Sequence, residues 1–144
     1  IRPSSKRADD LFTYITDVTW NHDHSHLVFH EMARLDSAYA QKGDVAIPHQ
    51  TGHIYFTTNR HGQHRLMLMR RIAKSGELYG LLLTLQQEKG AHLLPVSMPV
   101  VLLPVANLGE PPSLGVIGPT HKAHDAYREI LHRVVDGGFA SVLK

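Results

Sequence analysis

The clearest pattern of hydrophobic and polar positions lies between Gly52 and Gln87, where it predicts three β-strands joined by two turns. Ile54 to Thr58 is aromatic and β-branched, and a glycine-bearing loop of hairpin length follows it. Residues 64–72 and 78–85 are apolar on both faces at their middle, because leucines and methionines fill both alternating sets of positions. A strand that is apolar on both faces needs cover on both, so we expect these strands to lie at the centre of a sheet.

Two helices are predicted before this sheet. Apolar residues recur at helical spacing from Ala8 to Ile15 with acids in the first turn, although residues 13–16 would suit a strand equally. From His26 to Lys42, apolar residues fall at i, i+4, i+7 and i+11, and Gly43 stands where a helix would end. We therefore expect two amphipathic helices on the N-terminal side of the sheet.

The rest of the chain predicts edge strands, a loop and a last helix. Residues 44–47 suit a short edge strand, and residues 92–105 suit an irregular one because prolines interrupt it. After a loop rich in glycine and proline, Thr120 is expected to cap a helix that ends at Gly137. The predicted fold class is α+β: an antiparallel sheet of three to five strands flanked by two N-terminal helices and one C-terminal helix, in a single domain over residues 1–144.

Composition narrows the class of protein only slightly. A chain of 144 residues with 42% hydrophobic and 19% charged residues is long and apolar enough to form a globular core. The absence of cysteine excludes a disulfide scaffold, a thiolate nucleophile and any zinc site with cysteine ligands, but it leaves the compartment open. No apolar run is long enough to span a bilayer, so membrane insertion is not expected. A first residue other than Met predicts that the chain is processed or excised from a longer one.

The charge distribution is more informative than the net charge of +2. No acid occurs between Asp44 and Glu77, although five arginines and lysines and several histidines do. A loop that leads into the helix after Thr120 adds a lysine where free N–H groups favour an anion. The predicted anion-binding residues are Arg60, His61, His64, Arg65, Arg70, Arg71 and Lys122.

A second cluster is formed by histidine. His22, His24, His26 and His30 lie within nine positions, and as part of a strand the first three would share one face and could bind zinc through neutral imidazoles. As part of the predicted helix, the last two instead lie on its solvated side. The sequence therefore names these four histidines as metal-ligand candidates for zinc or copper; the cofactor is unknown, and zinc is possible.

No motif specifies a reaction. Residues 30–34, HEMAR, resemble the HExxH signature of zinc proteases, but arginine replaces the second histidine and removes a ligand. There is no P-loop, no G-x-G-x-x-G and no G-x-S-x-G. The hairpin around residues 62–66 resembles that of bacterial mRNA-interferase toxins, in which arginines and histidines on a sheet bind and cleave RNA; about 30 residues are covered, without a residue-by-residue motif.

Three hypotheses follow from these observations. The first is a binding domain for an anionic partner, either nucleic acid or a phosphorylated ligand, that uses a basic strip on the central sheet. The second is a histidine-based ribonuclease or hydrolase with His61 or His64 as general base. The third is a regulatory or sensor module of a larger protein that binds a protein partner through the loop at residues 108–119.

Overall fold

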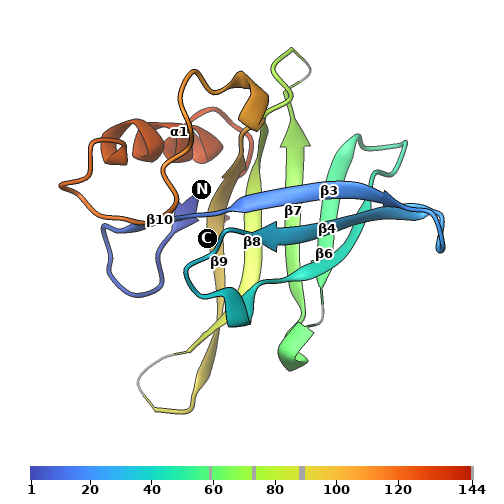
Figure 1. Ribbon diagram of the computed structural model, residues 1–144, viewed down its shortest axis with the longest axis horizontal. Coiled ribbons are helices and arrows are strands. Elements are labelled where there is room, and N and C mark those ends of the chain that lie inside the picture. Colours follow the sequence, from blue (N-terminus) through green and yellow to red (C-terminus); the bar gives the residue numbers. More distant parts are fainter. Residues whose placement is uncertain (59, 73, 88–89, 144) are drawn as a thin grey trace.

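The computed structural model describes residues 1–58, 60–72, 74–87 and 90–143, with the side chain of His61 also left out. Most of the chain forms a seven-stranded antiparallel meander, in which each strand pairs with the next one along the chain (Figure 1). Its strands are β3 (Ile15–Asn21), β4 (His26–Met32), β5 (Lys42–Ala46), β6 (His53–Thr58), β7 (Arg65–Arg71), β8 (Leu78–Gln87) and β9 (Leu93–Leu102).

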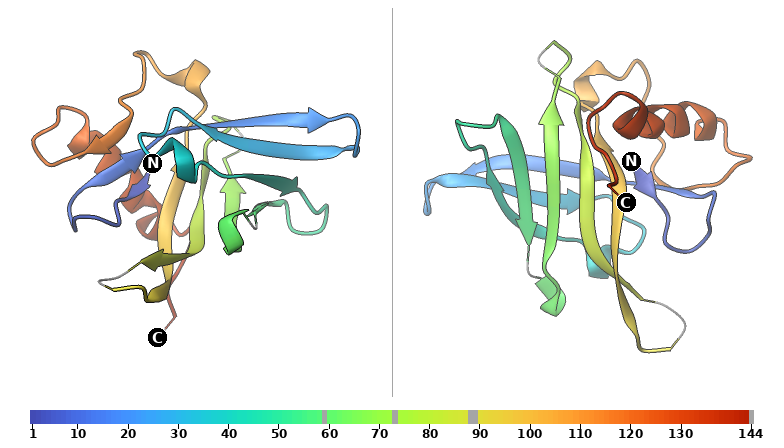
Figure 2. Two further views of the ribbon diagram at one scale, coloured as in Figure 1. Left: turned by 60° about the horizontal axis from the view of Figure 1, so that its bottom comes forward. Right: turned by 180° about the vertical axis from the view of Figure 1, so that it is seen from behind.

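The remaining elements lie beside one end of this sheet. A three-stranded antiparallel sheet has the order β1 (Arg2–Pro3), β2 (Leu11–Thr13), β10 (Gly115–Ile117). The helix α1 (His124–Asp136) follows, and three short 3-10 turns complete the described structure: η1 (Ser37–Tyr39), η2 (Arg60–Gly62) and η3 (Val105–Asn107). Figure 2 shows α1 and the small sheet on the β9 side of the large sheet.

The large sheet curls so that its first strands cross in front of its later ones (Figure 1). One buried cluster joins the inner faces of β4 and β9, which are five strands apart in the meander, and this contact requires the curl. Alternate residues of each strand point into this cluster and the others point outward. The inner core consists of Phe29, Val45, Ile54, Phe56, Met67, Met69, Leu82 and Val100.

Glycines permit the tight curl at two inner positions. A Cβ atom at Gly80 would lie 2.0 Å from the carbonyl oxygen of Leu68 on β7. A Cβ atom at Gly43 would lie 2.0 Å from the carbonyl oxygen of Thr57 on β6. Neighbouring strands approach so closely at these points that only a residue without a side chain fits.

A second core covers the outer face of β8 and β9. Tyr79 and Val101 point away from the inner core and pack against α1, whose buried residues include Leu131 and Val134. Leu11 and Ile117 complete this outer core, and the ring of Tyr79 stacks on Phe139 after the helix. The outer faces of β6 and β7 receive no comparable cover, as the view from behind in Figure 2 shows.

The prediction of two N-terminal helices is wrong. Residues 26–32 form β4, and the following residues form η1 and β5 instead of the remainder of a helix. The apolar residues that matched helical spacing are not the buried ones, because Met32, Leu35 and Tyr39 are all exposed. Burial falls instead on Phe29 and Glu31, which alternate as in a strand. The segment around Ala8 to Ile15 likewise contains β2 and the start of β3.

The predicted strand number is also wrong. Ten strands in two sheets replace the expected three to five, although β6, β7 and β8 lie where the sequence predicts three strands. The predicted edge strand at residues 44–47 corresponds to β5, which pairs on both sides, whereas the proline-interrupted β9 does lie at the edge of its sheet.

The C-terminal helix is present, but it starts later than predicted. Its N-cap is Ala123 instead of Thr120, and it ends at Gly137 as expected. Within the described part of the chain, no helix has the length and apolar character needed to cross a membrane.

Candidate functional site

The outer face of β5 to β8 holds a hollow of about 710 Å3 near η2. Lys42 and Arg60 supply its exposed cationic groups, His64 adds an imidazole, and we call it the cationic hollow. Its floor is partly apolar, because Leu66 of β7 and Leu83 of β8 line it and are not buried. The hollow therefore combines positive charge with apolar contact area.

One acid, Asp44, also lines the cationic hollow, and it is engaged by a histidine. The Nε2 atom of His26 lies 2.7 Å from its Oδ1, and Nδ1 of the same ring lies 3.2 Å from the carbonyl oxygen of His24. The carbonyl and then the carboxylate raise the pKa of His26, because both partners accept hydrogen bonds and only the imidazolium donates two. Protonation of His26 therefore neutralises the one acid of the hollow.

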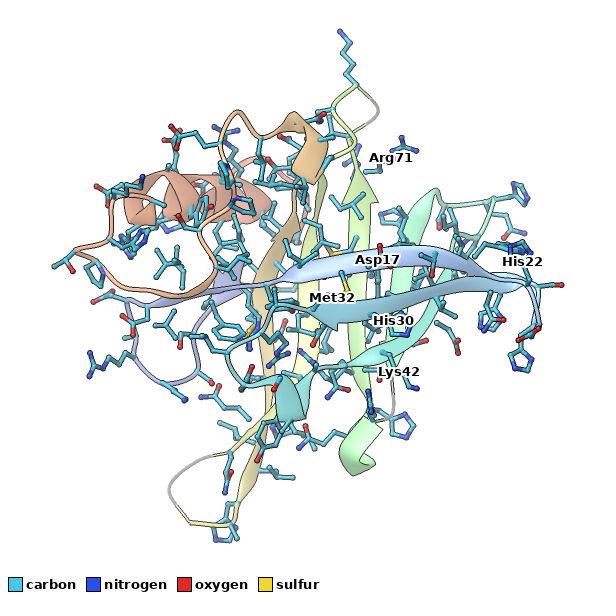
Figure 3. All side chains as sticks on the ribbon, viewed as in Figure 1. Asp17, His22, His30, Met32, Lys42 and Arg71 are labelled. Atoms are coloured by element: carbon cyan, nitrogen blue, oxygen red, sulfur yellow. The ribbon has the colours of Figure 1, made fainter. Side chains whose placement is uncertain are left out.

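The predicted anion-binding residues do not share one surface. Arg60 and His64 line the cationic hollow, whereas Arg70 and Arg71 lie at the opposite end of β7. Figure 3 shows this separation, with Lys42 toward one end of the sheet and Arg71 toward the other. The distance along β7 from residue 65 to residue 70 is roughly 17 Å, at about 3.3 Å per residue.

The other predicted residues lie elsewhere. Arg65 also lines the hollow, but its side chain points inward and is 11% exposed. Lys122 is exposed in the turn before α1, on the side of the molecule that carries the small sheet (Figure 1). His61 lies in η2, and its side chain is outside the described residues.

The candidate metal ligands come together only in part: the ring centres of His24 and His26 lie 6.1 Å apart, and both residues line one hollow with His30. His22 and His24 lie in the turn of the β3–β4 hairpin, and Figure 3 shows His22 at its tip and His30 on the body of β4. Asn21 shapes that turn by accepting hydrogen bonds from the backbone N–H groups of Asp23 and His24. In the described ranges, no three or more histidine, aspartate or glutamate side chains lie close enough together to hold a metal ion.

A second group of charged side chains lies at one end of the inner face, beyond the apolar core. Glu31, on β4, is buried, with 1% of its side chain exposed, and Nη1 of Arg34 lies 2.5 Å from its Oε2. Asp36 accepts two parallel hydrogen bonds from Nε and Nη2 of Arg34, both at 2.8 Å. The Arg34 side chain therefore bridges the carboxylates of Glu31 and Asp36, and these contacts hold it rigidly.

Two aromatic rings also contact the guanidinium group of Arg34. The Arg34 guanidinium carbon lies 5.2 Å from the ring centre of Phe12 and 5.0 Å from that of Tyr14. Burial acts to lower the pKa of Arg34, but Asp36 and Glu31 outweigh it and raise that pKa above its usual value. Burial, followed by the charge of Glu31, raises the pKa of Tyr14, so this phenol stays neutral.

Two further arginines join this cluster from distant parts of the chain. Nη1 of Arg65, on β7, lies 3.4 Å from Oε1 of Glu31. Arg2, on β1, places its guanidinium 4.9 Å from the ring centre of Phe12 and donates from Nη1 to the carbonyl oxygen of Pro3. The three arginines, Glu31 and Asp36 are called the arginine cluster below.

Sequence patterns did not reveal most of this cluster. The sequence predicts Arg65 as an anion-binding residue, but it predicts no role for Arg2 or Arg34. It also predicts none for Lys42 of the cationic hollow. The signal that could have found Glu31 is the alternation of Leu27, Phe29 and Glu31, which places the carboxylate on the buried face of a strand. The helical interpretation of this segment gives no such signal for Glu31.

Comparison of the chain with models of known protein families, with curated proteins and with solved structures finds no match. The functional conclusions below therefore depend on the geometry and charge of these sites.

Proposed function

We propose that this protein is a binding domain for an extended anionic partner, single-stranded nucleic acid in the first place, which lies across the outer face from the cationic hollow to the far end of β7. The observation that carries this proposal is the unpaired state of the exposed guanidinium groups. Within residues 1–58, 60–72, 74–87 and 90–143, neither Arg60, Arg70 nor Arg71 forms an ion pair with a carboxylate.

The contacts that these arginines do make leave their charges available. Arg60 donates to the carbonyl oxygen of Ala40 at 3.4 Å, and Arg70 lies 5.8 Å from the ring centre of Phe139. Neither contact neutralises a guanidinium. Exposed cations on a rigid sheet attract a polyanion mainly through phosphate contacts and the release of counterions.

The spacing of the cations favours an extended partner over a compact one. The two groups of cations lie at opposite ends of β7, roughly 17 Å apart by the rise of a strand. Between them the outer face presents Leu66, Leu68 and Tyr55, which are partly exposed and can contact bases or other apolar groups. A single strand of nucleic acid can bridge this distance and use both kinds of contact.

The test is the salt dependence of binding to a fluorescent single-stranded RNA, measured by anisotropy. Replacement of Arg70 by alanine should weaken binding and reduce the magnitude of the slope of log K against log salt concentration by about 0.7, the value for one lost phosphate contact. Arg60→Ala, at the other end of the path, should reduce it by about 0.7.

Arg128→Ala is the matched control, because this arginine is exposed on α1, away from the path. It should leave the slope unchanged. Equal slopes for the wild type and Arg70→Ala would reject the proposal.

The composition of the cationic hollow supports a second candidate, histidine-assisted cleavage of the bound RNA. His64 lines the hollow together with Arg60 and Lys42, so a base and two groups that stabilise phosphoryl charge lie around one cavity. Cleavage of RNA between about pH 5 and 8 that is lost in His64→Ala, with binding retained, would support it. Absence of cleavage by the wild type over this range would remove it.

A further inference from the structure

The arginine cluster contains more positive than negative charge. Arg2, Arg34 and Arg65 face the carboxylates of Glu31 and Asp36, so the group carries an excess of one positive charge. Asp36 and Glu31 are both committed to Arg34, and Glu31 has a further contact with Arg65. In the described part of the chain, Arg2 forms no ion pair with a carboxylate.

Two N–H groups of this cluster are buried without a partner. The Nε atoms of Arg2 and Arg65 make no hydrogen bond within the described structure, and each exposes almost no surface. Burial lowers the pKa of Arg2 below its usual value; the phenol of Tyr14 acts in the opposite direction, and the charges of Arg65 and Arg34 act in the same direction as burial. Buried guanidinium N–H groups are rarely left unsatisfied, because removing them from water is costly unless an acceptor replaces the water.

Both arginines line the same cavity. It has a volume of about 400 Å3 and lies between η1, the start of β7 and the β8–β9 hairpin. Gln63, Gln86 and Gln87 contribute amide groups to its wall, whereas Leu93 and Met98 contribute apolar surface. This volume lies within the range of small-molecule sites, which usually combine apolar walls with a few fixed polar groups.

We propose that this cavity binds a small organic acid and that the guanidinium groups of Arg2 and Arg65 hold its carboxylate. Lys6 also lines this cavity and adds to the excess of positive charge, which favours an anion. An arginine side chain offers Nε and one Nη as parallel donors, which fit the two oxygens of a carboxylate, and Nε is the atom left unpartnered in both residues. The amide and apolar walls would contact the uncharged body of the acid.

Arg34 acts as a positioning residue in this site. Its donors are occupied by Glu31 and Asp36, and its guanidinium lies against Phe12 and Tyr14. It therefore fixes Glu31, which in turn contacts Arg65. The ligand-binding groups are thus supplied by β1 and β7, while β4 and the segment after it hold them in place.

The first test requires no variant. Saturation-transfer NMR and calorimetry measure the binding of hexanoate, benzoate and N-acetylglutamine to the whole chain. Each acid is compared with its uncharged primary amide, and inorganic phosphate is tested as a further ligand. We expect at least one acid to bind about tenfold or more tightly than its amide, since charge-assisted hydrogen bonds are lost in the amide. Equal binding of acid and amide in every pair, no binding of any acid, or tighter binding of phosphate than of every acid would overturn the proposal.

The second test locates the site. Arg65→Gln should weaken the acid that binds best by about tenfold or more, whereas Arg71→Gln, on the exposed end of the same strand, should not change its affinity. The amide resonances of each variant show whether it is folded. If Arg65→Gln does not fold, Gln86→Glu, which adds a negative charge to the cavity wall, should weaken the acid instead.

Unchanged affinity in a folded Arg65→Gln variant, or in Gln86→Glu, would overturn the location. The RNA slope measured with Arg70 replaced is independent of these outcomes, because that residue does not line the cavity.

Discussion

The backbone at Ala33 has the left-handed conformation that L-residues rarely adopt, with φ of 53°. This residue joins β4 to the segment that carries Arg34, so the turn aims the guanidinium back at Glu31 on the same strand. An alanine in this conformation costs roughly 1–2 kcal/mol relative to the right-handed region, and glycine avoids this steric cost.

We expect Ala33→Gly to stabilise the protein. The gain should be about 0.5–1 kcal/mol, because relief of the left-handed conformation exceeds the entropy that glycine adds to the unfolded chain. Urea denaturation measures the change. Ala46→Gly is the control: this alanine is exposed in β5 without a positive φ, so its replacement should destabilise by roughly 0.5–1 kcal/mol. Loss of stability in Ala33→Gly would contradict the steric explanation.

His124 is a buried residue at the start of α1, and both of its ring nitrogens face acceptors. Nε2 lies 2.8 Å from the carbonyl oxygen of Asp9, and Nδ1 lies 3.3 Å from Oδ1 of Asp125. The carbonyl and then the carboxylate raise the pKa of His124, whereas burial and the charge of Arg128 act in the opposite direction. Because the folded pKa is raised, protonation favours the folded state.

A pH-dependent contribution to stability follows. It should be fully present below about pH 6.5, the value for an unfolded histidine, and should disappear as the pH rises through the higher folded pKa. The unfolding midpoints of the wild type and His124→Gln should therefore differ more at about pH 6 than at about pH 9. The pKa of His26 is raised as well, but this residue is present in both the wild type and His124→Gln, so its contribution to stability cancels in the comparison. His132→Gln, exposed on the same helix, is the control, and a pH-independent difference for His124→Gln would refute the prediction.

At the scale of elements, the curl of the large sheet depends on close approach of β8 to β7 at Gly80. Gly80→Ala should destabilise the protein by about 3 kcal/mol, because its Cβ atom would meet the backbone of Leu68 and cannot move away as a side chain could. Gly109→Ala serves as the control, since no heavy atom lies within 4 Å of its added Cβ and its φ is not positive. Equal stability of the two variants would show that the strands can separate without cost.

The central strands could be predicted because methionines and leucines fill both faces of β7, a pattern that requires a central position. The first half of the sheet could not be predicted in the same way. In β4, burial of Glu31 depends on Arg34 and on Arg65, which is 34 positions away, and local periodicity carries no information about such a partner. Val28 and Met32 are four positions apart, a spacing typical of a helix, and this local pattern led to the wrong prediction.

The same reason limits prediction of the sites. The local excess of cations around β7 is visible in the sequence, but whether neighbouring cations share a face depends on register and on the curl. Arg65 points inward and Arg70 outward on one strand. Arg2 approaches Arg65 only because β1 lies beside β9, a contact between strands that are far apart in the sequence.

At the scale of the whole molecule, the inner and outer cores share two strands. Leu82 and Val100 point into the inner core, while Tyr79 and Val101 point into the outer core from the same β8 and β9. Neither core can lose these strands without exposing apolar residues of the other. The two sheets and α1 should therefore unfold together.

This coupling can be measured with a probe on each side. Trp20, the one tryptophan, lies in β3, at the far end of the large sheet from α1. Its fluorescence and the helical signal in circular dichroism should change at the same urea concentration. In Leu131→Ala, which removes an outer-core side chain, both midpoints should fall together by an amount equivalent to about 2–5 kcal/mol. Loss of the helical signal before the fluorescence change would show that α1 unfolds independently.

The meander also determines the order in which the protein can fold. In the large sheet every hydrogen-bonded neighbour is the next strand along the chain, so each pairing closes only a short loop. The small sheet instead requires the closure of a long loop, because Phe12 pairs with Val116. The chain between these residues must already be compact. Since loop closure limits the rate of distant pairings, β2 and β10 should join last, after the strand pairings of the meander have formed.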